Sequence, residues 1–103
     1  MKDLQKRTPI RSKAIRAAAK DEPCCICGRN DGTTVFCHLD EGWAGKGMGQ
    51  KADDIAGFFG CSICHYEYGQ KWTKLAKSHE TIMRAMYQTL RRLWDRGIIG
   101  ELK

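Results

Sequence analysis

Two pairs of cysteines are the residues whose spacing most directly implies chemistry. Cys24 is separated from Cys27 by two residues, and Cys61 is separated from Cys64 in the same way. Each short loop lets two thiolates converge on one ion, so the two pairs together predict a tetrahedral Zn²⁺ site. Two disulfides are the alternative, which we disfavour because a bridge inside one tight turn is strained and crosslinks almost nothing.

Two further cysteines leave other assignments open. Cys25 adjoins Cys24, but only Cys24 has the two-residue gap to Cys27, so we take Cys24 as the ligand and Cys25 as a spare thiol. Cys37 directly precedes His38 and could form a different metal site with it.

His38 and His65 could carry the hydrolysis of a phosphodiester. That reaction needs a base to deprotonate water and a cation to neutralise charge that develops on the phosphate. Histidine titrates near neutrality, so His38 can be the base, and His65, next to Cys64, can bind a divalent ion. The alternatives are a structural or zinc-binding His38 and a His65 that only neighbours the zinc.

Two strands are expected to position these groups. Residues 33–36 are β-branched and aromatic, which predicts a strand that delivers Cys37 and His38. Residues 55–59 predict a second strand that returns to the second cysteine pair. Between them, residues 42–49 contain four glycines and Lys46, which predicts a mobile loop able to meet a phosphate. The loop lacks the ending of a Walker A motif, which excludes nucleotide binding of that kind.

Three helices are also expected. Ser12 can cap a short, alanine-rich helix that extends through Lys20. A second helix is expected from Ser62 to about Lys77, with His65 in its first turn. A long C-terminal helix is expected to start at Ser78 as its N-cap and to end at Gly97. Its predicted core stripe consists of Ile82, Met86, Leu90 and Leu93.

Length and composition favour one small α+β domain. The chain has 103 residues, a size at which a structural metal contributes substantially to folding. We expect a basic arm and short helix over residues 1–20 and a single folded unit over 21–103. The sequence has no run of eighteen apolar residues and no apolar secretory signal, so we expect a cytoplasmic protein without a membrane partner.

The basic charge is concentrated at the N-terminus. Residues 1–20 carry seven basic residues and one acidic residue, which accounts for the whole net charge of +6. Such an arm suits a polyanion, because lysine and arginine contacts to phosphate give affinity without sequence selectivity. The alternative is an arm that only aids solubility.

These motifs resemble the HNH endonucleases of the ββα-metal fold. Those enzymes often show a first cysteine knuckle, a strand that ends in the general-base histidine, and a Cys-x2-Cys-His knuckle whose histidine binds the catalytic metal. The matching motifs here are Cys24-Cys25-Ile26-Cys27-Gly28, Cys37-His38 and Cys61-Ser62-Ile63-Cys64-His65. More narrowly, the chain resembles the YbcO-like nucleases of phages and prophages. That resemblance rests on Pro9-Ile10-Arg11-Ser12-Lys13-Ala14, Gly45-Lys46-Gly47-Met48-Gly49 and Lys51-Ala52-Asp53-Asp54.

The resemblance implies a zinc-stabilised ββα-metal domain that cleaves DNA in phage recombination or DNA processing, in the cytoplasm of a bacterial host. It implies His38 as the base, Mg²⁺ or Mn²⁺ on His65, and Asp54 as a residue that orients His38 or binds the metal. Cys37 stands where many HNH enzymes have a metal-binding aspartate. The expected DNA-binding residues are Lys13, Arg16, Lys46 and Lys51.

Two other functions stay open. A non-catalytic zinc module could bind DNA or a recombination or replication protein. A redox-responsive zinc switch could use Cys25 and Cys37, although nothing basic flanks these thiols closely. The chain is expected to be a monomer or a weak homodimer.

Overall fold

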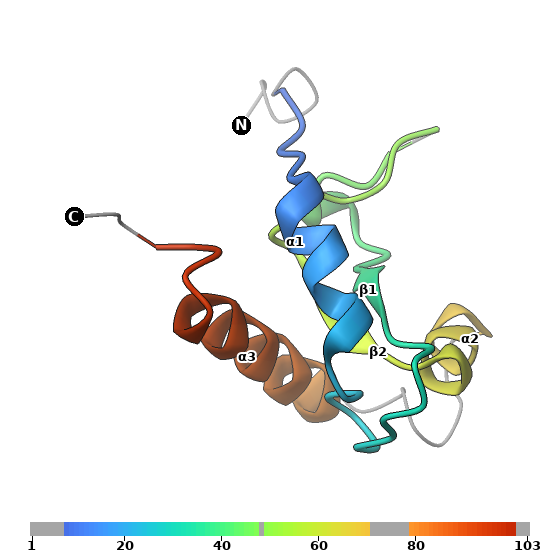
Figure 1. Ribbon diagram of the computed structural model, residues 1–103. Coiled ribbons are helices and arrows are strands. Elements are labelled where there is room, and N and C mark those ends of the chain that lie inside the picture. Colours follow the sequence, from blue (N-terminus) through green and yellow to red (C-terminus); the bar gives the residue numbers. More distant parts are fainter. Residues whose placement is uncertain (1–7, 48, 71–78, 101–103) are drawn as a thin grey trace.

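The computed structural model describes residues 8–47, 49–70 and 79–100. Within these ranges the chain forms a small α+β domain of two antiparallel strands, three α-helices and two 3₁₀ turns (Figure 1). The elements in order are α1 (Lys13–Ala18), η2 (Ala19–Asp21), β1 (Val35–His38), η3 (Gly42–Ala44), β2 (Gly57–Gly60), α2 (Ser62–Gln70) and α3 (His79–Asp95).

The two strands form a hairpin that places His38 at the end of β1. Val35 pairs with Gly60 and His38 pairs with Gly57. Both strands begin two residues later than the sequence predicted. At β1 the reason is local, because the backbone N–H and hydroxyl of Thr33 both donate to the Asp31 carboxylate and hold Thr33 in a turn.

The core lies on both faces of this hairpin. Phe36 and Phe59 pack edge to face and belong to a buried cluster with Ile15 of α1 and Leu93 of α3. Phe58 belongs to a second cluster on the other face, together with four small or aliphatic residues and Cys37. Alternate residues of each strand therefore face different layers, as the pleat of a strand requires.

Helix α3 packs along β2 with three of the four predicted stripe residues, since Leu93 is buried and Ile82 and Met86 are partly buried against the core. Its buried residues are Ala85, Thr89 and Leu93, whereas Leu90 is exposed. The Thr89 hydroxyl donates to the Ala85 carbonyl at 2.8 Å and accepts the Phe59 N–H at 2.9 Å. This polar contact turns Thr89 toward β2, which rotates Leu90 away from the core. The predicted cap at Ser78 lies outside the described residues, and Gly97 follows the helix with a φ of 74°.

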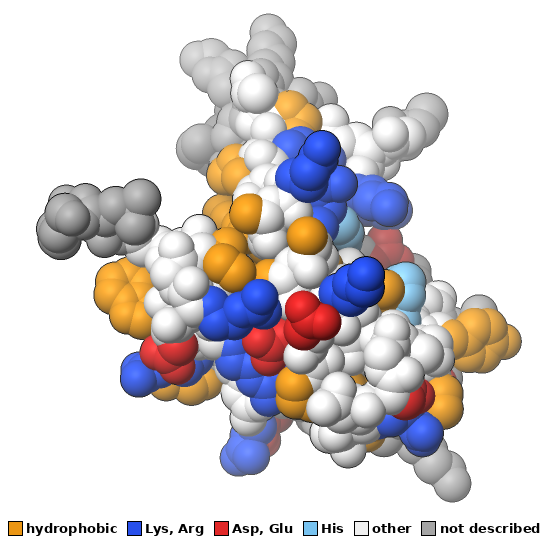
Figure 2. Space-filling view, viewed as in Figure 1, with side chains coloured by type: hydrophobic (Ala, Val, Ile, Leu, Met, Phe, Trp, Pro, Cys, Tyr) orange, Lys and Arg blue, Asp and Glu red, His pale blue; other side chains and the backbone are white. Residues whose placement is uncertain are grey.

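The short helix α1 is anchored in the core rather than free. The Ser12 hydroxyl accepts the Ile15 N–H, as predicted for its cap, and Ile15 and Ala18 are buried. The helix passes into η2 before Lys20. The division of the chain at residue 20 stays a prediction. Figure 2 shows lysine and arginine side chains over this helix, beside a histidine.

The described residues of the glycine-rich loop adopt a defined local structure, while the mobility expected from the sequence stays a prediction. It begins with η3, turns at Gly45 with a φ of 99°, and closes with a bridge between Gly47 and Gln50. The Gln50 side chain also donates to the Gly45 carbonyl at 2.8 Å. In the described residues, no helix is long and apolar enough to cross a bilayer.

Candidate active site and metal centre

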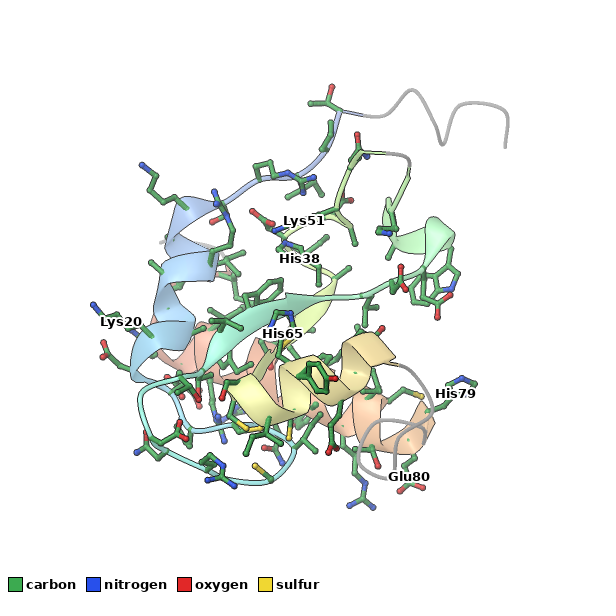
Figure 3. The ribbon with its side chains drawn as sticks, turned by 90° about the vertical axis from the view of Figure 1, so that its right-hand side faces the viewer. Lys20, His38, Lys51, His65, His79 and Glu80 are labelled. Atoms are coloured by element: carbon green, nitrogen blue, oxygen red, sulfur yellow. The ribbon has the colours of Figure 1, made fainter. Side chains whose placement is uncertain are left out.

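His38 and Asp54 form a hydrogen-bonded dyad at the end of the hairpin. His38 Nε2 lies 2.7 Å from Asp54 Oδ1, and the Asp54 side chain is fully buried. The Phe36 ring packs edge to face against the imidazole, with ring centroids 5.0 Å apart. Figure 3 shows His38 on the strand, with Lys51 above it and His65 below it on α2.

The Asp54 carboxylate is surrounded by donors from the N-terminal segment. Its Oδ2 accepts the Ser12 backbone N–H at 2.7 Å and Arg16 Nε at 3.0 Å, and Arg11 lies 3.7 Å from Oδ1. Burial alone would raise the pKa of Asp54, but the bonds from His38 and Ser12 and the positive charge of Arg16 outweigh burial and lower this pKa. Asp54 is therefore ionised at neutral pH.

The same N-terminal segment fixes the backbone of the loop that carries Asp54. The Asp54 N–H donates to the Ile10 carbonyl at 2.8 Å, and the Ile10 N–H donates to Asp53 at 3.2 Å. The Arg11 guanidinium donates to the carbonyls of Ala52 at 2.8 Å and Lys51 at 2.9 Å. Four residues of the N-terminal segment, Ile10, Arg11, Ser12 and Arg16, thus hold the loop that carries Asp54.

An ionised Asp54 determines the protonation of His38. The carboxylate can only accept hydrogen bonds, so Nε2 of His38 must carry the hydrogen in this contact. In the neutral imidazole, Nδ1 is then the nitrogen that can take a proton. Because both oxygens of Asp54 already accept hydrogen bonds inside the protein, Asp54 is suited to orient His38 and poorly suited to bind a metal.

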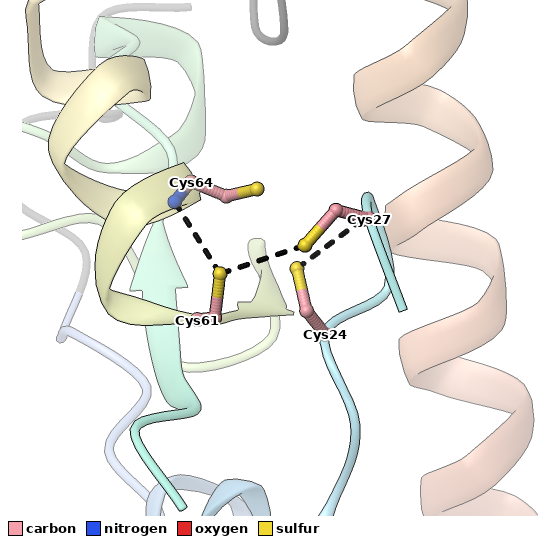
Figure 4. Close-up of side chains that lie close together, drawn as sticks. All are labelled: Cys24, Cys27, Cys61 and Cys64. Atoms are coloured by element: carbon pink, nitrogen blue, oxygen red, sulfur yellow. Dashed lines mark hydrogen bonds between the residues drawn. The ribbon is translucent and has the colours of Figure 1, made fainter. Parts of the chain in front are cut away.

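The four cysteines of the two pairs converge at one point between the start of α2 and the 24–27 loop (Figure 4). The sulfur atoms of Cys24, Cys27, Cys61 and Cys64 all lie within 4.8 Å of one another, and those of Cys27 and Cys61 are 3.7 Å apart. A four-thiolate set at this spacing is consistent with structural zinc.

Backbone donors support the sulfur atoms of this cluster. The N–H of Ile26 lies 3.3 Å from the Cys24 sulfur, and the N–H of Cys64 lies 3.5 Å from that of Cys61. For Cys24, burial raises the pKa, but hydrogen bonds from backbone N–H groups outweigh it and bring the pKa down to about 7. Such donors stabilise the thiolate of Cys24, the form that binds a metal, whereas burial and the neighbouring thiols raise the pKa of Cys64.

The two remaining thiols do not belong to this cluster. The Cys25 sulfur lies 3.4 Å from the Thr89 hydroxyl, and burial raises the pKa of this thiol. Cys37 is fully buried on the other face of β1, and burial raises its pKa to about 12. This arrangement supports Cys24 over Cys25 as the ligand, and neither spare thiol has the lowered pKa of a redox-active cysteine.

His65 lies in the first turn of α2, directly after the last cysteine. Its N–H donates to the Cys61 carbonyl at 2.8 Å, and its side chain is exposed. It lines an open groove together with Thr33, Val35, Ser62, Tyr66 and Gly69. Among the described residues, the four cysteines are the only group of three or more potential ligands that converge, so His65 stands outside any second cluster there.

The four predicted DNA-binding cations are exposed, but two of them have partners. Arg16 bonds Asp54 while its side chain stays 47% exposed, and Lys46 pairs with Asp40 at 3.1 Å. Lys13 and Lys51 are exposed on α1 and on the loop before Asp54. Sequence reasoning gave no role to Arg11. The only sequence signal for Arg11 was its place in the motif of residues 9–14. Its partners lie about forty residues further along the chain, and no local sequence pattern indicates this contact.

Comparison with known proteins identifies the family. A family model described as "Putative nuclease YbcO" matches residues 13–97, which include the His38–Asp54 dyad and all four clustered cysteines. No curated protein and no solved structure gave a match. The matched residues cover most of the chain, and the protein therefore belongs to the family that this description names, the YbcO family.

Proposed function

We propose that this protein is an HNH-type, metal-dependent endonuclease that hydrolyses phosphodiester bonds in DNA, with His38 as the general base. The observation that carries the proposal is the dyad of a buried Asp54 and a partly exposed His38, in which Asp54 Oδ1 lies 2.7 Å from His38 Nε2. Family membership supports a nuclease. The resemblance implies that it acts in phage recombination or DNA processing, in the cytoplasm of a bacterial host.

The dyad can perform the proton transfer that hydrolysis needs. With Nε2 protonated by its contact with Asp54, Nδ1 of His38 can take a proton from the attacking water. The resulting imidazolium is stabilised by the negative charge of Asp54. The Phe36 ring and the fixed carboxylate hold the imidazole in one orientation, which lowers the entropy lost when water and phosphate are aligned.

The surface beside the dyad can bind the phosphate. Arg16 uses Nε for Asp54, and its 47% exposed side chain leaves the guanidinium accessible to a phosphate oxygen. Lys13 and Lys51 add positive charge from α1 and the 51–54 loop, and Lys46 adds charge that Asp40 partly offsets. Such contacts bind the DNA backbone without reading its sequence.

Two metal roles follow from the donor sets. Cys24, Cys27, Cys61 and Cys64 fit Zn²⁺, which would hold α2 against the 24–27 loop. We assign Mg²⁺ or Mn²⁺ to His65 as its protein ligand, with water and phosphate oxygens as the other ligands. When bound, this ion would neutralise charge on the phosphate and the leaving oxygen.

One observation favours a second candidate function. Among the described residues, no second group of three potential metal ligands converges. The buried Cys37 thiol also stands at the position where many HNH enzymes have a metal-binding aspartate. A zinc module that binds DNA, or a recombination or replication protein, without cutting would have this composition.

A substrate panel separates the two functions. Zinc-loaded protein is incubated with supercoiled, linear, single-stranded and branched DNA, with and without Mg²⁺ or Mn²⁺, and His65→Ala is tested in parallel. We expect cleavage that depends on the added metal and is lost in the variant. Binding without cleavage on every substrate would establish the non-catalytic module.

A further inference from the structure

Helix α3 carries a second apolar stripe that the core does not use. Met83, Tyr87, Leu90 and Trp94 are 67%, 64%, 39% and 58% exposed. They follow one another at intervals of four, three and four residues. This spacing keeps them on one face of the helix and is the a/d spacing by which two helices pack together. Figure 2 shows hydrophobic side chains at the left edge of the molecule, over the C-terminal end of α3.

The exposed stripe is large enough for an interface. From these exposed fractions, the four side chains present roughly 500 Å² of surface, which is the size of patch that usually has a function. With the aliphatic parts of flanking residues, two such faces would bury on the order of 1,000 to 1,400 Å² in total, enough for a weak but specific dimer.

The charges beside the stripe argue against DNA as its occupant. Glu80 pairs with Arg84 at 2.9 Å, and Arg91 pairs with Asp95 at 3.2 Å, both within the helix. The charges of these four residues cancel, although the whole chain carries a net charge of +6. A neutral, apolar face disfavours a polyanion, and it brings little repulsion when two copies of a basic protein meet through it.

We propose that this face binds a second copy of the chain, with the two α3 helices antiparallel around a two-fold axis between Tyr87 and Leu90. In that arrangement Tyr87 meets the partner's Leu90, and Met83 meets the partner's Trp94. Each aromatic ring then packs against an aliphatic side chain. A parallel pair would instead stack Trp94 on Trp94 and Tyr87 on Tyr87, which fills the interface less evenly.

Such a dimer leaves the His38 surface free. The stripe lies on the part of α3 turned away from β2, whereas Ala85, Thr89 and Leu93 face the hairpin that carries the dyad. Both dyads would stay accessible, as two cuts on one DNA molecule would require.

Sedimentation of the zinc-loaded full chain tests the interface. We expect the mass to rise from 11.7 kDa toward twice that value between about 1 and 300 µM, with a dissociation constant in the micromolar range. Tyr87→Glu should weaken association at least tenfold. Tyr66→Glu is the matched control, because Tyr66 is 67% exposed on a different helix, and it should associate like the wild type.

A charge exchange tests the orientation. Met83→Lys or Trp94→Glu alone should weaken the dimer, and the double variant should restore it, because antiparallel pairing places each lysine against a partner's glutamate. Circular dichroism and zinc content confirm that each variant is folded. A wild-type monomer at the highest concentration, an equal effect of Tyr66→Glu, or no restoration in the double variant would each overturn the proposal. If the wild type is a monomer at every concentration and still cleaves DNA, the dimer proposal fails and the nuclease assignment stands.

Discussion

The Asp54→Asn substitution tests the dyad most sharply, because it changes one atom and leaves the shape of the side chain intact. Asp54 Oδ2 accepts two donors, from Ser12 and Arg16, so the amide oxygen of the asparagine should stay on that side. Its NH₂ group then faces His38 Nε2 and must donate to it. This contact moves the imidazole hydrogen to Nδ1, the nitrogen that the base needs free.

The expected magnitudes follow from the same contacts. In the variant, the three hydrogen bonds to residue 54 no longer involve a charged acceptor. The contribution of Arg16 is small because its half-exposed side chain is screened by solvent. We therefore expect the unfolding free energy to fall by about 2 to 4 kcal/mol. Losing a positioned base should slow cleavage by about 10² to 10⁴. Urea unfolding and single-turnover cleavage measure the two effects.

The stability difference should depend on pH. Because folding lowers the pKa of Asp54, the ionised carboxylate stabilises the folded protein at every pH above its unfolded pKa of about 3.9. That stabilisation is lost as the pH falls through the lower, folded pKa. The gap between wild type and Asp54→Asn should therefore be full at pH 7 and should shrink below about pH 4.

Nitrogen NMR of the three histidines reads the tautomer directly and does not require activity. We expect a protonated Nε2 in the wild type and a protonated Nδ1 in Asp54→Asn. Asp53→Asn is the matched control, since Oδ1 of Asp53 accepts the Ile10 N–H and an amide keeps that oxygen. The reasoning fails if both variants behave alike, or if the His38 tautomer is unchanged in Asp54→Asn.

Two further predictions concern the scaffold. Cys64→Ser should lower zinc content and unfold at lower denaturant than the wild type, while Cys25→Ser should keep its zinc, as measured by atomic absorption; equal zinc loss in both variants would contradict the cluster. Thr89→Val should lower the unfolding free energy by about 1 to 3 kcal/mol, because it leaves the buried Phe59 N–H without its acceptor, and an unchanged urea midpoint would contradict this.

The local features of the site could be predicted from the sequence. The two-residue gaps predicted which cysteines converge, and Cys24 rather than Cys25 joins the cluster because only Cys24 has the right gap. The Ser12 cap and the hairpin that carries His38 also followed from local chemistry. The cap, each strand and each cysteine pair depend on residues within one turn or one strand, whereas the convergence of the two pairs followed from the four ligands that a zinc ion takes.

The contacts that complete the site could not be predicted in this way. Ser12 and Arg16 reach Asp54 across about forty residues, and no periodicity in either segment indicates the other. The basic arm suggested free phosphate ligands, yet Arg11 and Arg16 also bond to the loop that carries Asp54. On α3, hydrophobic periodicity placed Leu90 in the core, whereas the Thr89 hydroxyl determines which face of the helix meets β2.

The most direct test of the central claim is cleavage of supercoiled plasmid by His38→Ala beside His79→Ala. His79 is an exposed histidine at the start of α3, and Figure 3 shows it at the lower right edge, away from His38. Both zinc-loaded variants are compared with the wild type in Mg²⁺ or Mn²⁺. We predict that His79→Ala cuts at the wild-type rate and that His38→Ala loses at least about 10²-fold. Equal cleavage by the two variants would contradict the assignment of His38 as the base.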